Sequence, residues 1–480
     1  MSSDTRPRNR SIYPVTSRWV RWALAFTLLF GAAIYFMPLA RASLLVTNAT
    51  FLTMKPGETA PVVGYMLVDD YGKIIELAAG APSATTKATT TFDATNKIII
   101  PGFVSAHSHV WQSAFRGLGI NHNTGEWLQD LALHSRAATD DDLYWFTLHG
   151  ALGHLVHGIT SAFNFGYNVR VGEYNNTQLR GLLDSRMRFV HGFAQHRSIP
   201  VEEQYQSFLR YYDFAKQYLN DWKFLRVGIF GDGALLEHAR FDKRLMDQFG
   251  VLNQTHFLSE AYSLTRDGHR IGKEQVQKRF QNFIDANTLG PNQYFGHFIH
   301  TNDAMLKQAA AAGSGMSWQP LSNGRLGSGI ADIPKYVALG VKVGIGVDGE
   351  ASADIADPFE NIRMGLYFIR ASYGYASIMQ PIDVLRMATM GSAELMGIAD
   401  KVGSLEVGKY ADFIVISPHS PVFDVAATIV FAVNSANLDA VYVGGEKLVD
   451  HLALTRSDMA DVNKEVEMRV GRLRATVRKQ

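Results

Sequence analysis

Short apolar segments alternate with amphipathic helical segments through the middle of this 480-residue chain, and this alternation constrains the fold more than any other feature. It is typical of βα units whose strands form a parallel sheet. The strand candidates are IIIPGFVSAH, GITSAFNF, RFVHGFAQH, FLRVGIF, VLNQTHFL, QYFGHFIH, GMSWQP and VKVGIGVD. Eight such units predict a closed (β/α)8 barrel.

Two β-rich segments flank this middle region. One begins at Ser43 and contains a turn at 70–73, and the other includes the runs GSLEVGKYADFIVIS and AVYVGG near the C-terminus. We expect the two flanks to share one sheet domain. The predicted division is 43–100 with 403–453 for a composite β domain, 101–402 for the barrel, and 454–480 for a charged helical tail.

The first 42 residues have the pattern of an export signal. Residues 1–21 contain five arginines and one acidic residue, and an uncharged apolar stretch follows at 22–40. Pro38 interrupts this stretch just before a small-x-small sequence of the type that signal peptidase cuts. Cleavage after Ala42, which would deliver the chain to the periplasm or the medium, is the favoured interpretation. A retained inner-membrane anchor is the alternative.

Composition excludes several classes of function. Lys plus Arg number 46 and Asp plus Glu number 45, so no basic field favours nucleic acid. The absence of cysteine excludes disulfides, thiol catalysis and cysteine-bound metals, so His, Asp or Glu must hold any metal. The expected partner is a small-molecule substrate, with membrane contact only through residues 1–42 if they are retained. A homo-oligomer is left open.

Residues of the type that bind metals stand at the ends of several strand candidates. His107 and His109 end the first strand, and residues at i and i+2 of a strand point to the same face, so both imidazoles can converge on one ion. His256, His297 and Asp348 end three later strands. Because barrel enzymes carry their active sites at the carboxyl ends of the strands, these residues predict a metal site there.

Four separated motifs carry a family resemblance. They are PGFVSAHSHVWQSAFRGL at 101–118, QPLSNGRLGSGI at 319–330, VGIGVDGEAS at 343–352 and MATMGSAELMGIADKVGSLEVGKYADFI at 387–414. The chain from Ser43 to about Asp450 resembles the amidohydrolase superfamily, in the branch of cytosine and guanine deaminases and triazine hydrolases. The resemblance implies a distorted (β/α)8 barrel and a small β-sandwich built from both chain ends.

Carried onto this sequence, the resemblance makes His107, His109, His256 and Asp348 the ligands of one divalent metal, either zinc or iron. Such a metal activates a bound water by lowering its pKa, and Asp348 would accept the proton. His297 would hydrogen-bond to the atom that is polarised as the tetrahedral intermediate forms. The fourth strand candidate offers no lysine to hold a second metal, so one metal is favoured.

One position departs from the deaminase pattern. In the deaminase branch, a glutamate three residues beyond the fifth-strand histidine shuttles a proton to the leaving group. Here Ser259 stands at that position and Glu260 follows it, so a bulge at the strand end would be needed to bring Glu260 into the site. The shift favours the broader prediction, hydrolysis of a non-peptide C–N bond in a small cyclic or heterocyclic substrate. Deamination of a purine, pyrimidine or triazine is the alternative.

Other side chains are expected to contact a flat substrate. They are Trp111 and Gln112 after the first two histidines, His196 at the end of the third strand, and Trp318 at the end of the seventh. A non-catalytic exported solute-binding protein is the rival from another class, because export and a pocket suit both. The combination of metal ligands with a base favours an enzyme.

Overall fold

The computed structural model describes residues 41–167, 174–196, 198–219, 222–260, 262–264 and 270–478. The expected export segment lies outside these residues up to residue 40, and Ala42 is already the first residue of a strand. Within the described ranges, no helix combines the length and the apolar character needed to span a membrane.

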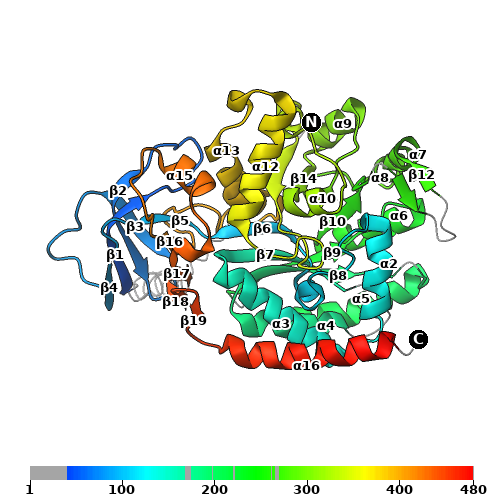
Figure 1. Cartoon of the computed structure of the whole chain (residues 1–480), viewed down its shortest axis with the longest axis horizontal. Helices are drawn as coiled ribbons and strands as arrows, with labels where there is room; N and C mark the ends of the chain where they lie inside the picture. Colours follow the sequence, from blue (N-terminus) through cyan, green and yellow to red (C-terminus); the bar gives the residue numbers. More distant parts are fainter. Residues whose placement is uncertain are drawn as a thin grey trace, which may run out of the picture. The chain divides into compact units, whose positions relative to one another are not determined.

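Eight parallel strands form a barrel, and their spatial order follows the chain (Figure 1). They are β6 (Phe103–Ser108), β7 (Ile159–Phe165), β8 (Arg188–Ala194), β9 (Phe224–Phe230), β10 (Leu252–Phe257), β13 (Gln293–His297), β14 (Gly315–Trp318) and β15 (Lys342–Ile345). Beyond β15 the chain continues to Asp348, which forms a parallel bridge with Ser108 of β6. The barrel is therefore nearly closed, which confirms the predicted fold class.

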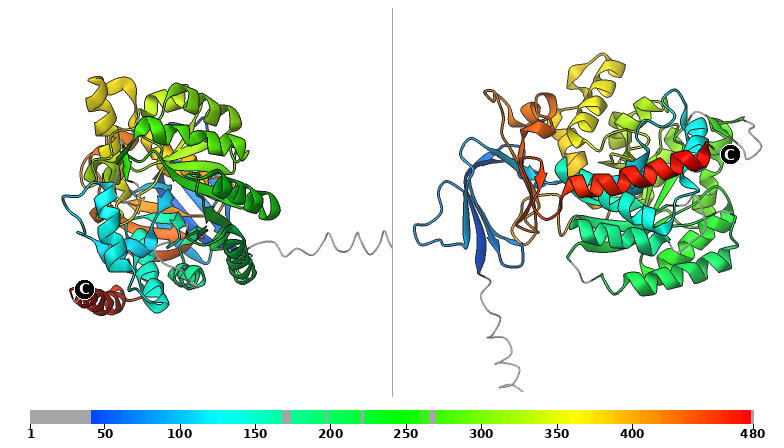
Figure 2. Two further views of the ribbon diagram at one scale, coloured as in Figure 1. Left: turned by 90° about the vertical axis from the view of Figure 1, so that its right-hand side faces the viewer. Right: turned by 60° about the horizontal axis from the view of Figure 1, so that its bottom comes forward.

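Helices cover the outside of the barrel (Figures 1 and 2). The main ones are α3 (Asp140–Val156), α4 (Tyr174–Ser185), α5 (Val201–Ala215), α6 (Leu236–Phe249), α8 (Phe280–Asp285), α9 (Asp303–Ala312), α11 (Ile333–Ala338) and α12 (Pro358–Tyr373). Local sequence sets their ends. Thr139 and Asp142 form a capping box at the start of α3, and Gly250, with φ of 63°, ends α6 in the left-handed conformation.

Additional elements lie in the loops and after the barrel. They are η1 (Val110–Phe115), α2 (Thr124–Ser135), β11 (Tyr262–Leu264), β12 (Arg270–Gly272), α7 (Lys273–Lys278), α10 (Pro320–Arg325), η2 (Ala376–Ile378), α13 (Pro381–Arg386), η3 (Met387–Gly391), α14 (Ser392–Leu395), α15 (Val425–Phe431), η4 (Ser435–Asn437) and α16 (Met459–Val477). Of these, η1 and α2 follow the first barrel strand directly and contribute to the site.

A second, mixed sheet is built from both ends of the chain. Its strands are β1 (Ala42–Phe51), β2 (Val62–Asp69), β3 (Ile74–Ala79), β4 (Thr90–Asp93), β5 (Ile98–Pro101), β16 (Phe413–Ile416), β17 (Leu438–Val443), β18 (Glu446–Asp450) and β19 (Ala453–Leu454). The two halves join where β5 pairs antiparallel with β16, with Ile100 opposite Ile414. Buried apolar side chains from both halves share one core.

The C-terminal helix α16 packs on the barrel, mainly on α3 (Figure 2). Val462, Val466 and Leu473 are buried, whereas most of the other α16 side chains are exposed. Arg469 forms an ion pair with Asp141 of α3. The charged tail of the sequence is thus an amphipathic helix with one apolar face.

A buried ion pair connects the barrel with the segment that enters β16. Arg188, at the start of β8, donates from Nε and Nη2 to the two carboxylate oxygens of Asp412 at 2.6 and 3.0 Å. Both side chains are buried, and the guanidinium lies 3.7 Å from the ring centre of Tyr410. Asp412 also accepts a hydrogen bond from the backbone of Gly444 at 2.7 Å. The carboxylate therefore holds barrel and sheet segments together.

We expect Asp412→Ala to lower the free energy of unfolding by about 3 to 5 kcal/mol, because it leaves the Arg188 charge buried and unpaired. The matched control is Asp213→Ala, which removes an exposed partner of Lys216 and should cost no more than about 1 kcal/mol. Chemical denaturation of both variants measures the difference. A loss for Asp412→Ala no greater than that of the control would contradict the prediction.

Candidate metal centre and active site

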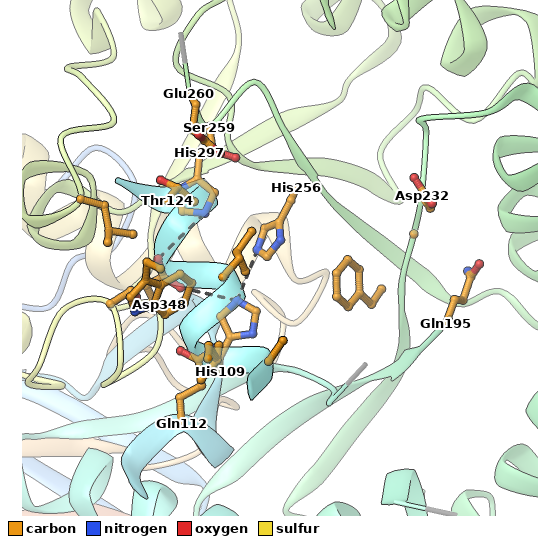
Figure 3. Close-up of a pocket in the computed structure, with 18 of the residues that line it drawn as sticks. His109, Gln112, Thr124, Gln195, Asp232, His256, Ser259, Glu260, His297 and Asp348 are labelled. Atoms are coloured by element: carbon orange, nitrogen blue, oxygen red, sulfur yellow. Dashed lines mark hydrogen bonds and ion pairs between the residues drawn. The ribbon is translucent and has the colours of Figure 1, made fainter. Parts of the chain in front are cut away.

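Five side chains converge at the carboxyl ends of four barrel strands. Figure 3 shows four of them, His109, His256, His297 and Asp348. His107 lies in β6 and His109 just after it, His256 lies in β10, His297 ends β13, and Asp348 follows β15. These are the residues that the sequence places at strand ends. The fold brings all five together because parallel strands present their carboxyl ends at one rim of the barrel.

Their ligand atoms are close to one another. His256 Nε2 lies 3.1 Å from His107 Nε2 and 3.3 Å from His109 Nε2. Asp348 Oδ1 lies 3.4 Å from His107 Nε2 and 3.5 Å from His109 Nε2. Oδ2 of the same carboxylate lies 3.9 Å from His297 Nε2. Four imidazole nitrogens and the two oxygens of one carboxylate thus surround one small volume.

The hydrogen bonds of His107 show which of its nitrogens faces this volume. Its Nδ1 lies 2.9 Å from Oε1 of Gln254, whose own amide nitrogen donates to the Ala106 carbonyl at 2.8 Å. His107 Nδ1 is therefore the donor, and Nε2 presents a lone pair to the other histidines. Burial lowers the pKa of His109 to about 3, so this imidazole is neutral near pH 7.

The separations of 3.1 to 3.3 Å between these nitrogens are close to the roughly 3.3 Å between tetrahedral ligands that lie about 2.0 to 2.1 Å from a zinc ion. The set of three imidazoles and one carboxylate is of the kind that binds a divalent transition metal, and zinc in particular. The residues present therefore fit one divalent metal ion: the ligand atoms of His107, His109 and His256 lie within 4.8 Å of one another, and so do those of His107, His297 and Asp348.

Two residues of the site adopt left-handed backbone conformations. His297 has φ of 68° and Asp348 has φ of 62°. Such angles cost energy for residues with a Cβ, and neighbouring hydrogen bonds hold them here. The backbone N–H of His297 donates to Gln319 Oε1 at 2.9 Å, and that of Asp348 donates to the His107 carbonyl at 3.0 Å. The conformations direct both side chains toward the metal-binding volume.

Several supporting side chains were not predicted. Phe165 of β7 stacks on His256 with ring centres 4.4 Å apart, and Asn323 Oδ1 lies 2.9 Å from His297 Nδ1. Gln254 and Gln319 complete this set. The strand alternation contained a signal for Gln254, because it stands two residues before His256 and therefore shares its face.

A cavity of about 490 Å3 is lined by four of the five residues, His109, His256, His297 and Asp348. Its volume is in the range of small-molecule sites. Trp111 and Gln112 of η1 form part of its wall, together with apolar side chains of α2 that include Trp127 and Leu131. Among the described residues, the indole N–H of Trp111 and the side-chain oxygen of Gln112 are buried without a hydrogen-bond partner. The cavity thus combines apolar walls with a few unpaired polar atoms.

The structure places three of the four expected substrate contacts on this cavity. Trp111, Gln112 and His196 line it. Trp318 is not among the described residues of its wall. It is buried between the barrel and α12, where a Cβ added at Gly365 would lie 2.7 Å from the indole ring. The expectation for Trp318 is corrected for a simple reason. Successive residues of a strand face opposite sides, and Trp318 points outward toward α12.

Glu260 lies on the cavity wall together with Ser259 and His297 (Figure 3). The pairing of β10 with β13 is regular as far as Phe257, so the strand contains no bulge. Instead, Leu258 just beyond it has φ of 53°, and this turn brings Glu260 to the cavity. Burial raises the pKa of Glu260 to about 7, and its Oε2 atom has no partner within the described parts of the chain.

We call a second group of polar residues the distal cluster; Gln195, Asp232 and His238 of this group line the cavity, and Figure 3 shows Gln195 and Asp232 away from Asp348. Its members are Gln195 after β8, Asp232 after β9, and His238 and Asp242 of α6. Gln195 donates to Asp242 at 2.6 Å, and Asp232 lies 3.1 Å from His238 Nδ1. Burial raises the pKa of Asp242 to about 7. The sequence analysis named none of these residues.

A barrel with a histidine and aspartate metal centre at the carboxyl ends of its strands defines a metal-dependent hydrolase. The chain belongs to the amidohydrolase family, because residues 98–448 match the family pattern "Amidohydrolase family". The match confirms the superfamily that the four sequence motifs indicate. As a member, the protein is a hydrolase of C–N bonds other than peptide bonds.

The chain is also similar to several individual proteins. The chain is 26% identical over 441 residues to a 5-methylthioadenosine/S-adenosylhomocysteine deaminase of Desulforudis audaxviator, covering 90% of this chain and 99% of that protein. It is 27% identical over 439 residues to a 5'-deoxyadenosine deaminase of Methanosarcina acetivorans, covering 88% and 96%. An adenosine deaminase from Xanthomonas campestris, solved with bound zinc, has a similar fold with a TM-score of 0.79 at 20% identity, covering 91% and 100%.

We expect His107→Ala and Asp348→Asn each to abolish both metal retention and turnover, because the first removes an imidazole nitrogen and the second replaces a charged carboxylate by a neutral amide. Elemental analysis of the purified variants measures metal content, and the matched control is His122→Ala, a half-exposed histidine outside the cavity wall. Stoichiometric metal in either ligand variant, or active wild-type enzyme without metal, would refute the assignment.

Proposed function

We propose that the protein is an aminohydrolase that removes the exocyclic amino group of adenosine-type nucleosides. The observation that carries this proposal is the position of Glu260, a carboxyl group on the wall of the same cavity as the metal centre. The named relatives support the substrate class, because they are deaminases of 5-methylthioadenosine, S-adenosylhomocysteine and 5'-deoxyadenosine. All these compounds carry an adenine amine.

A divalent metal, when bound, supplies a Lewis acid and an activated water. His107, His109, His256 and Asp348 hold it, and Asp348 has a second carboxylate oxygen that can accept a proton. His297 lies beside that oxygen and would contact the atom that gains negative charge during the reaction.

Glu260 would perform the step that distinguishes a deaminase. Ammonia leaves a heterocycle only after the amine is protonated, so a deaminase needs a group that takes up a proton and delivers it to nitrogen. With a pKa of about 7, the Glu260 carboxyl can both accept and donate a proton near neutral pH. Its unpaired Oε2 atom is available for this transfer.

Zinc is the metal we propose. Three imidazole nitrogens and a carboxylate suit zinc, and the similar adenosine deaminase structure contains it. Iron, the other metal considered from the sequence, prefers similar ligands. Metal analysis of the purified protein distinguishes the two.

We expect Glu260→Gln to reduce kcat about 10²- to 10⁴-fold while the metal stays bound, because the amide can no longer transfer a proton and is not a ligand. Ammonia release from adenosine, 5'-deoxyadenosine and 5'-methylthioadenosine measures the effect. The matched control is Glu274→Gln on the exposed start of α7, which should leave kcat unchanged. Equal kinetics of Glu260→Gln and wild type would remove the main argument for a deaminase.

We also propose that the protein is exported and that cleavage after Ala42 leaves Ser43 as the first residue. The arginine-rich start and the apolar stretch at 22–40 support this proposal. Nearly all of β1 would remain after cleavage, because only Ala42 is removed from it. N-terminal sequencing of protein from the periplasmic fraction should begin at Ser43. Intact Met1 in a membrane fraction would instead establish a retained anchor.

A further inference from the structure

The distal cluster has no part in the chemistry proposed above, yet it places buried titratable groups beside the cavity. Such groups are costly to bury, and when they face a cavity they often mark a functional site. Asp242 is completely buried on α6, and Gln195 is 8% exposed and lines the cavity. Figure 3 shows Gln195 and Asp232 well apart from Asp348 and Glu260. The cavity therefore has two polar regions, and one of them holds the metal centre.

Hydrogen bonds determine which atom Gln195 presents to the cavity. Its Nε2 donates to Asp242 Oδ1 at 2.6 Å, while Asp242 Oδ2 accepts from the backbone N–H of Asp232 at 2.9 Å. Because the amide nitrogen donates to Asp242, the oxygen Oε1 is the polar atom of Gln195 that a ligand can contact. In the described residues no hydrogen bond to Gln195 Oε1 occurs. The distal wall thus presents a hydrogen-bond acceptor in a fixed orientation.

A neighbouring glutamine shows what a purely structural role looks like. Gln204 also lines the cavity, but its Oε1 accepts from the His196 backbone at 3.0 Å and its Nε2 donates to the Ile199 carbonyl at 2.9 Å. The oxygen and the nitrogen of that amide thus both form hydrogen bonds with the backbone before α5. Gln195 differs because only its nitrogen is used by the protein. Its oxygen remains for a ligand.

We propose that Gln195 is a specificity-determining residue whose Oε1 accepts a hydrogen bond from a ribose hydroxyl of the substrate, and that Asp242 is the positioning residue that orients it. This inference rests on the proposed function. The compounds named for the relatives share adenine and the 2'- and 3'-hydroxyls but differ at the 5' position. With the adenine amine at the metal centre, the ribose is the part of the substrate that extends away toward the distal wall.

The test compares adenosine with 2',3'-dideoxyadenosine, which lacks both hydroxyls. We expect wild-type kcat/KM to favour adenosine by about 10-fold, since one hydrogen bond contributes roughly this factor. In Gln195→Met the ratio should fall to near 1 through a higher KM for adenosine, with 2',3'-dideoxyadenosine kinetics and metal content unchanged. The matched control, Gln206→Met, alters an exposed glutamine of α5 and should preserve the ratio. An unchanged ratio in Gln195→Met, or equal losses for both substrates, would overturn the proposal.

The role of Asp242 is tested with the same ratio. Asp242→Ala frees the Gln195 amide and should lower the preference for adenosine as much as Gln195→Met does, and the double variant should lower it no further. Asp242→Asn keeps one acceptor oxygen for Gln195 Nε2 and should retain part of the preference. A wild-type ratio in Asp242→Asn and Asp242→Ala alike would show that Asp242 does not orient Gln195.

Equilibrium binding separates this inference from the proposed function. Dissociation constants for adenosine and 2',3'-dideoxyadenosine are measured on metal-loaded Glu260→Gln and on Glu260→Gln/Gln195→Met. If wild type releases no ammonia from either nucleoside, the proposed function fails. A binding preference for adenosine of about 10-fold that disappears in the double variant still supports the role of Gln195. Equal binding of both nucleosides, or binding of neither, overturns that role.

Discussion

Backbone pairing between β6 and the segment after β15 is the constraint on which the metal centre depends. Asp348 donates to the His107 carbonyl at 3.0 Å and accepts from the His109 backbone at 3.2 Å. Ser105 Oγ adds to this pairing by accepting a hydrogen bond from the backbone N–H of Val347 at 3.1 Å. The contacts that nearly close the barrel therefore also place three of the four metal ligands side by side. Without this pairing, Asp348 would not be held beside His107 and His109.

This arrangement also accounts for the strained residues at the rim. Asp348 pairs with β6 while its φ of 62° departs from the extended conformation of a strand, and its carboxylate lies beside His107 and His109. The strain persists because hydrogen bonds on both sides of the residue fix its peptide groups. Hydrogen bonds within the protein thus fix the backbone of His107, His109 and Asp348, and fixed polar groups of this kind favour electrostatic catalysis.

The sequence was sufficient to predict the barrel, the sheet formed by both chain ends, and the five residues at the strand ends. Strand length, alternation and residue type carry that information. Trp318 was misplaced because a four-residue strand does not reveal which of its faces points inward. The distal cluster was missed because its members come from two strand ends and one helix, and no spacing along the chain connects Gln195 with Asp242. Only tertiary packing brings such residues together.

Glu260 stands four residues after His256, one more than in the deaminase pattern, and the place where this extra residue is accommodated determines its effect on the site. One residue inserted within β10 would have moved every following side chain to the opposite face and separated Gln254 from His256. Here the pairing with β13 stays in register through Phe257, and the left-handed turn at Leu258 accommodates the additional length after the last ligand. The ligand geometry is therefore independent of the shift, and the carboxyl group still reaches the cavity. In this chain, the regular register of β10 and the turn at Leu258 together determine where Glu260 lies.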